Sequence, residues 1–207
     1  MSKLTLKDRL RSRSINRWHS VAINQNQNIA EHSHCMGIIA EDILERLHAD
    51  PKKQPSIEDR YAVIKYPQLH DLPEIVTGDM TSVFKRFLVK TVPGFNSAME
   101  AIEEELVPEL ASFKLLFIEK PYLGIICRAA DILEALSSFI IIKGNDTEHN
   151  DAVFNDLNNG ISSLVSEGQE TQPLFNWTIL FDVAKDIEHG KSNAINFESK
   201  LKLVIAK

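Results

Sequence analysis

The sequence predicts an all-α fold built as one domain. Apolar residues recur near the 3.6-residue period of an amphipathic helix along most of the chain. Strand signals are weak, because the chain contains no alternating β-branched run. A chain of 207 residues, of which 43% are hydrophobic, suits a single domain with a sizeable core. We therefore expect residues 1–207 to form one helical bundle.

Three helices are predicted in the first half of the chain. Residues 29–49, "IAEHSHCMGIIAEDILERLHA", carry apolar or small side chains on one helical face. Residues 56–71 open with a start that resembles a capping box and keep the helical period, although Pro67 implies a kink or a break. Residues 97–110 form a third predicted helix, interrupted near Pro108.

The second half of the chain contains the most apolar predicted helix. Residues 121–144 begin with proline, end with glycine and are apolar nearly all round, so this helix belongs at the centre of the fold. Residues 147–167 and 176–190 are amphipathic, and Gly190 is suited to end the second of them. Residues 197–207 are expected to form a last short helix.

Composition excludes several classes of protein. The net charge of −6 argues against a protein that binds polymeric nucleic acid. The longest apolar run is shorter than the ~18 residues of a membrane span, and the basic start lacks the apolar segment of a secretory signal. Cys35 and Cys127 form no disulfide framework; they are expected to pack in the interior, with thiolate ligation of zinc as the alternative. We expect a cytoplasmic protein without a membrane partner.

A candidate metal site can be assembled from distant segments. Asp131 lies in the most apolar predicted helix, where a carboxylate needs a cation, either a metal ion or Arg128 three residues earlier. His70 and Asp71 are adjacent, and His32 lies early in its helix. Two imidazoles and two carboxylates suit Co²⁺, Mn²⁺, Ni²⁺, Zn²⁺, Fe²⁺ or Mg²⁺ without selecting among them.

The same residues carry a family resemblance. His32, the His70-Asp71 doublet and the lone Asp131 resemble the HD-domain metal-dependent phosphohydrolases. The stretches "INRWHSV", "IAEHSHCMG", "LHDLPEIVTGDMTS" and "ICRAADILEAL" look like the bacterial HD-domain 5′-deoxyribonucleotidases and their phage-encoded relatives that hydrolyse deoxynucleoside triphosphates. The resemblance covers about residues 10–145, and residues 146–207 would add C-terminal helices. It implies an HD-domain helical bundle that forms a homodimer or a higher homo-oligomer.

The resemblance also implies roles for individual side chains. One divalent ion (Co, Mn, Mg, Ni or Zn) would be held by His32, His70, Asp71 and Asp131. The groups expected to act in catalysis are Glu74, on the attacking water or the leaving group, and Asp71. The expected substrate contacts are Arg17 on phosphate, Trp18 on the sugar, Asp79 on the nucleoside and Lys85 on phosphate.

The chemistry of these residue types fits the implied roles. A divalent ion lowers the pKa of its water, and Arg17 offers a planar fork for phosphate oxygens. A tryptophan against C2′ would exclude a ribose hydroxyl. Each role also has a simpler alternative: Arg17 could pair with a surface carboxylate, and Trp18 could be a core aromatic. Asp79 could cap the helix that starts at Thr81, or hold a second metal ion with Glu74.

Pro73 bears on the state of Glu74. Because proline disfavours helical geometry in the preceding residue, we expect the helix that carries the His70-Asp71 doublet to end at Leu72. A new short helix would then begin at Pro73, with Glu74 in its first turn. The positive helix end favours a carboxylate, so Glu74 is expected to be charged in the free enzyme and to act as a base.

These observations lead to a metal-dependent hydrolase of 2′-deoxyribonucleotides. The simplest interpretation is a phosphatase of deoxynucleoside 5′-monophosphates. The alternative is a deoxynucleoside triphosphate triphosphohydrolase of the dATP type, which releases all phosphates. A lesser alternative is a non-catalytic nucleotide-binding protein, which the presence of Glu74 and the full set of expected ligands disfavours.

Overall fold

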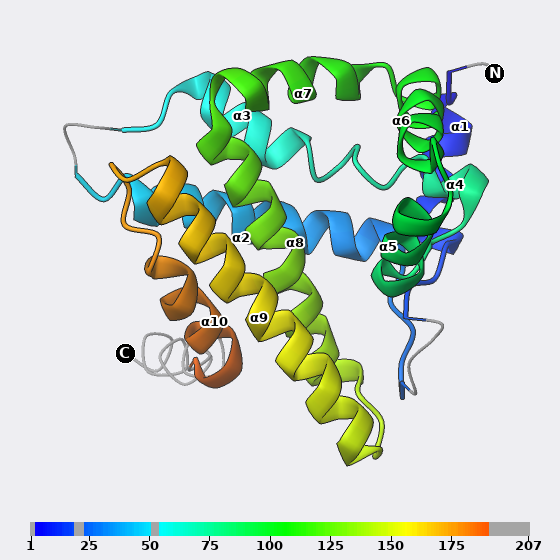
Figure 1. Ribbon diagram of the computed structural model, residues 1–207. Helices are drawn as coiled ribbons and strands as arrows, with labels where there is room; N and C mark the ends of the chain where they lie inside the picture. The colour runs from blue at the N-terminus through cyan, green and yellow to red at the C-terminus, as the bar shows by residue number, and fades with distance from the viewer. Residues whose placement is uncertain (1–2, 19–22, 51–53, 191–207) are drawn as a thin grey trace, which may run out of the picture.

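The computed structural model describes residues 3–18, 23–50 and 54–190, which form ten α-helices and one 3-10 helix (Figure 1). Within these ranges there is no β-strand, and the only extended pairings are two isolated bridges. One bridge joins Asn16 to Asn28, and the other joins Ile23 to Lys143. The all-α prediction is confirmed. The predicted helix over 197–207 lies outside the described residues.

Helix α8 (Pro121–Ile142) runs through the centre of the fold, as its composition predicts (Figure 1). It packs most extensively against α2 (Ile29–Leu47) and also contacts α9 (Thr147–Thr171), α10 (Ile179–His189) and α7 (Glu109–Glu119). Apolar side chains all round α8 allow it to be buried on several sides at once. Within this apolar helix, however, Glu134 is also buried.

Helix α2 is fixed at its start by a capping box. The Asn28 side chain accepts a hydrogen bond from the backbone N–H of Glu31, and the Glu31 carboxylate accepts one from the backbone N–H of Asn28. This pairing satisfies two N–H groups that an α-helix leaves unbonded. His32 follows directly and lies on the buried face, together with Met36, Ala40, Ile43 and Leu44. The helix start therefore determines where the His32 ring enters the interior.

The predicted helix over residues 56–71 is too long. Helix α3 (Ile57–Lys65) has the predicted capping box at Ser56, but residues 66–73 form a series of tight turns. Pro67 has no N–H group, so it cannot continue the helical hydrogen-bond ladder. Bonds between residues three apart replace that ladder, including Leu69 N–H to Tyr66 O at 2.9 Å. His70 and Asp71 thus lie in a turn segment and not on a helix.

A group of short elements gathers at one end of the molecule. Helix α4 (Glu74–Thr77) follows the turn segment, and α5 (Ser82–Thr91) contacts α6 (Phe95–Leu106). The N-terminal α1 (Leu6–Arg9) and the 3-10 helix η1 (Leu10–Ser14) lie at the same end (Figure 1). This end surrounds the start of α2, where His32 is located.

The remaining predicted helices are present, although α7 continues to Glu119 and α9 to Thr171, past the predicted ends at residues 110 and 167. The interruption expected near Pro108 separates α6 from α7, and Pro108 is the N-cap residue of α7. Helices α9 and α10 lie where the two amphipathic segments predict them, and Gly190 is the C-cap residue of α10. Among the described residues, no helix combines the length and the apolar character that crossing a membrane requires.

Candidate metal centre

Three segments meet at the candidate metal centre: α2, the 66–73 turns and α8. Nε2 of His32 lies 3.3 Å from Oδ2 of Asp71 and 3.3 Å from Oδ1 of Asp131. Nε2 of His70 lies 3.1 Å from Oδ1 of Asp71. Donor atoms on one metal ion with bonds of about 2.0–2.2 Å are separated by roughly 3 Å, so these spacings suit a shared cation.

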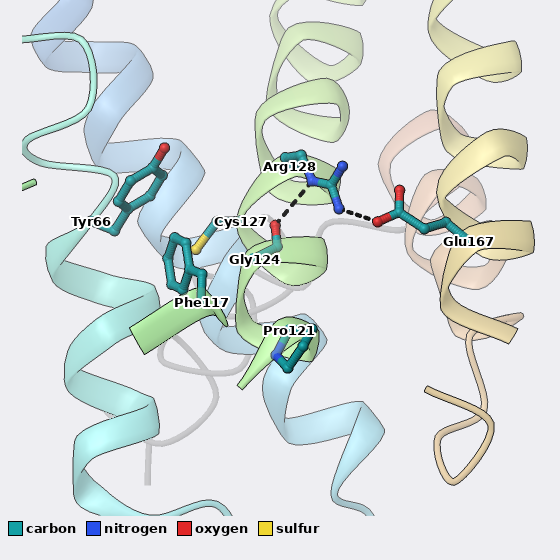
Figure 2. A pocket seen from close by; sticks show the side chains of 7 residues that line it. All are labelled: Tyr66, Phe117, Pro121, Gly124, Cys127, Arg128 and Glu167. Carbon is teal, nitrogen blue, oxygen red and sulfur yellow. Dashed lines mark hydrogen bonds and ion pairs between the residues drawn. The ribbon is translucent and has the colours of Figure 1, made fainter. Parts of the chain in front are cut away.

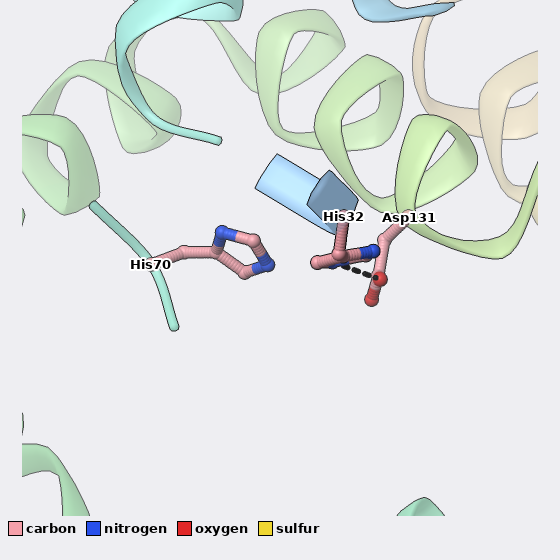
Figure 3. Close-up of side chains that lie close together, drawn as sticks. All are labelled: His32, His70 and Asp131. Atoms are coloured by element: carbon pink, nitrogen blue, oxygen red, sulfur yellow. Dashed lines mark ion pairs between the residues drawn. The ribbon is translucent and has the colours of Figure 1, made fainter. Parts of the chain in front are cut away.

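The two imidazoles approach this point from opposite sides. Figure 3 shows His32 beside Asp131, with the ring of His70 facing them from across the centre. One ligand atom of each of these three residues lies within 4.8 Å of the others. The structure therefore brings together all four residues that the sequence suggests as ligands, with Asp71 between the two rings.

The hydrogen bonds of the two rings determine which nitrogen faces the centre. Nδ1 of His70 donates to the carbonyl oxygen of Pro67 at 2.9 Å, and Nδ1 of His32 lies 2.5 Å from Oε2 of Glu134. A carbonyl or carboxylate partner keeps the proton on Nδ1, which leaves Nε2 with a free lone pair in a neutral ring. Both Nε2 atoms are buried and lack a hydrogen-bond partner within the described part of the chain. This donor set fits a divalent metal ion.

Electrostatics at the centre favour a cation. Burial alone would lower the pKa of His32, but the neighbouring carboxylates of Asp131 and Glu134 raise it to about 9. Burial alone would raise the pKa of Asp71, but His70, His32 and Arg17 together hold it well below its usual range. The carboxyl groups of Asp71, Asp131 and Glu134 surround His32, and a metal ion would take the place of its proton.

Sequence reasoning missed Glu134, which is the most buried carboxylate of the site. Its side chain is 1% exposed, whereas that of Asp131 is 46% exposed. Asp131 lies on the apolar helix as predicted, but the deeply buried carboxylate of this helix is Glu134. A signal was present in the sequence, because Glu134 follows Asp131 by three residues on the apolar helix and so shares its face.

Arg128 does not pair with Asp131. Its guanidinium bonds Glu167 of α9 and the backbone oxygen of Gly124, at the edge of a cavity of about 270 Å³ (Figure 2). The buried Cys127 lines the same cavity, and burial raises the pKa of its thiol. Cys35 is exposed. Neither cysteine belongs to the group of residues that could hold a metal ion.

Arg17 and Trp18 lie beside the centre. Arg17 is 16% exposed, and its guanidinium nitrogens lie 3.6 Å from Oε2 of Glu134 and 3.9 Å from Oδ1 of Asp131. Trp18 has a φ of 66°, a left-handed backbone conformation that costs a bulky residue about 1–3 kcal/mol. Its ring stacks on Phe139 of α8 at a centroid distance of 5.5 Å. Because Arg17 is largely buried and lies beside the buried Glu134, its pairing with a surface carboxylate is excluded.

Glu74 differs from its expected state. Burial, followed by the charges of Asp71 and Asp79, raises the pKa of Glu74 to about 9, so it is protonated at neutral pH in the metal-free protein. The expectation of a charged Glu74 is wrong, because α4 has only four residues and its positive end does not outweigh burial and two carboxylates. Pro73 is the N-cap residue of α4 and not its first helical residue.

Asp79 and Lys85 lie near Glu74, since the charge of each changes its pKa. The cap of α5 is Thr81, whose side chain accepts from Phe84 N, so Asp79 does not cap this helix. Nζ of Lys85 lies 3.9 Å from Oε1 of Glu103. The structure thus brings both predicted substrate contacts to the Glu74 side of the centre.

Comparison with known proteins agrees with this geometry. The family described as 5′-deoxynucleotidase YfbR-like matches residues 7–170. The chain belongs to this family, and it is an HD-domain phosphohydrolase.

Individual relatives are phage proteins. The chain is 27% identical to the dATP triphosphohydrolase of Acinetobacter phage SH-Ab 15497 over 198 residues, 92% of this chain and 90% of the relative. It is also 27% identical to the dATP triphosphohydrolase of Salmonella phage PMBT28, over 42% of this chain and 46% of that protein. Among solved structures, it resembles the cyanophage S-2L HD phosphohydrolase DatZ, bound to dA and one catalytic Zn²⁺ ion. The TM-score is 0.70 at 20% identity, covering 91% of this chain and 99% of that one, which supports the fold.

Proposed function

We propose that this enzyme is a deoxynucleoside triphosphate triphosphohydrolase that acts on dATP. The observation that carries the proposal is the similarity to a phage dATP triphosphohydrolase along 92% of the chain. This similarity favours the triphosphate as the substrate. The simplest interpretation of the sequence, a phosphatase of monophosphates, becomes the second candidate. Water would attack the α-phosphorus and break its bond to O5′, releasing deoxyadenosine and triphosphate.

The proposed metal ligands are His32, His70, Asp71 and Asp131. A bound divalent cation supplies a more acidic water and neutralises phosphate charge. Asp71 bridges the two rings, since its two oxygens lie 3.1 Å from Nε2 of His70 and 3.3 Å from Nε2 of His32. Its low pKa keeps it ionised in this position.

Arg17 and Glu74 are the proposed groups for charge and proton transfer. The guanidinium of Arg17 lies between the carboxylates of Asp131 and Glu134, at distances longer than those of hydrogen bonds. One of its nitrogens, Nη1, is buried and has no hydrogen-bond partner in the described chain. That nitrogen is available to a phosphate oxygen. In the metal-free protein, burial and the charges of Asp71 and Asp79 raise the pKa of Glu74 to about 9, and a protonated Glu74 could donate its proton to the leaving O5′.

The remaining proposed contacts select and hold the nucleotide. Trp18 would pack on the sugar and exclude a 2′-hydroxyl, and Asp79 would contact the nucleoside. Lys85 would neutralise the outer phosphates, which a triphosphate has and a monophosphate lacks. A second cation at Glu74 and Asp79 would have to displace the Glu74 proton. We also propose that the enzyme acts in the cytoplasm as a homodimer or higher homo-oligomer.

A second candidate function is hydrolysis of deoxynucleoside 5′-monophosphates, which the family description supports. To separate the two, metal-free protein is incubated with Co²⁺, Mn²⁺, Mg²⁺, Ni²⁺ or Zn²⁺ and with dATP, dADP or dAMP. ATP and AMP serve as controls, and chromatography identifies nucleoside, phosphate and triphosphate. Triphosphate from dATP with little reaction of dAMP is the expected result. Faster turnover of dAMP, with no triphosphate from dATP, would replace the proposal by the second candidate.

A further inference from the structure

A continuous chain of hydrogen bonds runs from Trp18 to His32. The indole Nε1 of Trp18 donates to Oε1 of Gln27 at 2.9 Å, and Nε2 of Gln27 donates to Oε1 of Glu134 at 2.6 Å. The other carboxylate oxygen of Glu134 accepts from Nδ1 of His32 at 2.5 Å. Gln27, Glu134 and His32 are buried, so these bonds do not compete with water.

The orientation of the Gln27 amide follows from its partners. Its oxygen faces an indole N–H, which can only donate, and its nitrogen faces a carboxylate oxygen, which can only accept. The same nitrogen lies 2.5 Å from Oγ of Ser138, which itself donates to Glu134 at 2.6 Å. A flipped amide would place oxygen against carboxylate and nitrogen against the indole N–H. Only one orientation therefore satisfies all the groups.

Gln27 also fixes the backbone next to Trp18. Its carbonyl oxygen accepts from the N–H of Arg17 at 2.8 Å, directly before the left-handed residue Trp18. Stacking on the fully buried Phe139 fixes the ring of Trp18 from the other side. A left-handed tryptophan persists only where surrounding contacts determine it, and Gln27 supplies two of these contacts.

We propose that Gln27 is a positioning residue that couples the sugar-facing Trp18 to the metal ligand His32 through Glu134. The part of the proposal that concerns sugar selection rests on the proposed function. Because one amide serves both ends, disturbing it loosens the tryptophan and the histidine together. Discrimination against ribonucleotides and affinity for the metal ion are thereby linked.

The test is the variant Gln27→Met, which keeps the length of the side chain and removes its hydrogen bonds. Two quantities are measured: Co²⁺ affinity by absorbance titration without substrate, and the ratio of kcat/KM for dATP over ATP. We expect Co²⁺ affinity to fall by about tenfold, the lower end for residues that orient metal ligands. The dATP/ATP ratio should fall by about fivefold, the effect of one lost hydrogen bond.

Two neighbouring variants serve as matched controls. Ser138→Ala removes the hydroxyl contacts with Glu134 and Gln27 but keeps the Trp18–Gln27 hydrogen bond, so it should weaken Co²⁺ binding without changing the dATP/ATP ratio. Phe139→Leu removes the stacking partner of Trp18 but leaves every hydrogen bond between Trp18 and His32 in place, so it should change the ratio without changing Co²⁺ affinity. The proposal is overturned if Gln27→Met changes neither quantity or only one of them.

Because Co²⁺ affinity is measured without substrate, a failure of this proposal can be distinguished from a failure of the proposed function. A wild-type protein that hydrolyses neither dATP nor ATP would disprove the function, while Co²⁺ affinity would still decide on the coupling. If Gln27→Met does not fold, Trp18→Phe is the second variant: it keeps one aromatic ring and removes the indole N–H together with the second ring. It should weaken Co²⁺ binding by about two- to threefold, although the hydrogen bond that it removes is to Gln27, which is not a proposed metal ligand. Unchanged Co²⁺ affinity in Trp18→Phe would contradict the coupling.

Discussion

The two ends of the α2–α8 helix pair use histidine in different ways. At one end, here called the metal end, His32 of α2 meets Asp131 and Glu134 of α8. At the other, the aromatic end, His48 packs with Tyr122, Phe175 and Trp177 in a series of ring contacts 5.0–6.0 Å apart. The helices run in opposite directions, so the end of α2 lies beside the start of α8.

The difference lies in what the second helix supplies. His48 donates from Nδ1 to the carbonyl oxygen of Leu44 in its own helix, and rings surround it. His32 donates to a carboxylate 102 residues away in the sequence, and its Nε2 faces two more carboxylates. A helical histidine therefore becomes a candidate ligand only where distant carboxylates converge on it. Substitutions that remove side chains at the metal end should lower activity, and those at the aromatic end should lower the free energy of unfolding.

Asp131→Ala should have the largest effect. It removes one proposed ligand, so dATP turnover should fall by at least ~100-fold, the upper figure for residues that merely orient ligands. Because the Asp131 side chain is 46% exposed, the metal-free protein should keep its stability within about 1 kcal/mol. Turnover and urea unfolding of the metal-free protein are measured together. A variant that unfolds, or that keeps full activity, would contradict the claim that the metal end serves activity and not stability.

Trp177→Ala should show the opposite pattern. Trp177 is fully buried, and its indole donates to the carbonyl oxygen of Gln172 at 3.0 Å. Its removal should lower the free energy of unfolding by about 3–5 kcal/mol, the usual cost of truncating a buried aromatic residue. Co²⁺ affinity of the folded variant should equal that of the wild type. A parallel loss of Co²⁺ affinity would mean that the two ends are not independent.

Gly168→Ala refines the assignment of stability to the aromatic end. A Cβ at Gly168 would lie 2.4 Å from a ring atom of Trp177, which cannot move without displacing its neighbours, so a loss of about 1–3 kcal/mol is expected. Gly160→Ala, in the same helix, is the matched control. Its Cβ would meet only the flexible tip of Ile132 closely, at 2.9 Å, and the helix gains propensity from alanine. Equal destabilisation of the two variants would argue against a rigid aromatic end.

The smallest effect concerns pH at the metal end. The pKa of His32 is about 9 in the metal-free protein, above its ordinary 6.5, so a metal ion must displace a proton. Apparent Co²⁺ affinity should therefore rise by about tenfold per pH unit toward pH 9. In the metal-free protein the same shift stabilises the fold below about pH 6.5, and this contribution is lost as pH rises through about 9. Calorimetry in buffers of different ionisation enthalpy measures the proton released; no release at pH 7.5 would contradict this.

Much of the fold could be predicted from the sequence because helices are local. The apolar period and the prolines indicate α2, α8, α9 and α10, and Pro108 marks the break before α7. A kink or break at Pro67 could be predicted, because its missing N–H ends the ladder, but the turns over residues 66–73 could not, since the helical period continues past the proline.

The candidate site was predictable in part. His32, His70, Asp71 and Asp131 could be proposed from motifs, and the structure brings them together. The proposed role of Gln27 could not be predicted from the sequence. Its side chain bonds Glu134, and no periodic pattern reports contacts between distant segments. The protonation of Glu74 was missed for the same reason, since it depends on burial in the folded chain.

The most direct test of the account is anomalous diffraction from a crystal of the active enzyme grown with Co²⁺. The account predicts one strong peak within about 2.0–2.3 Å of Nε2 of both His32 and His70, and of carboxylate oxygens of Asp71 and Asp131. A crystal of active enzyme without density at this position, or with Co²⁺ bound only elsewhere, would contradict it.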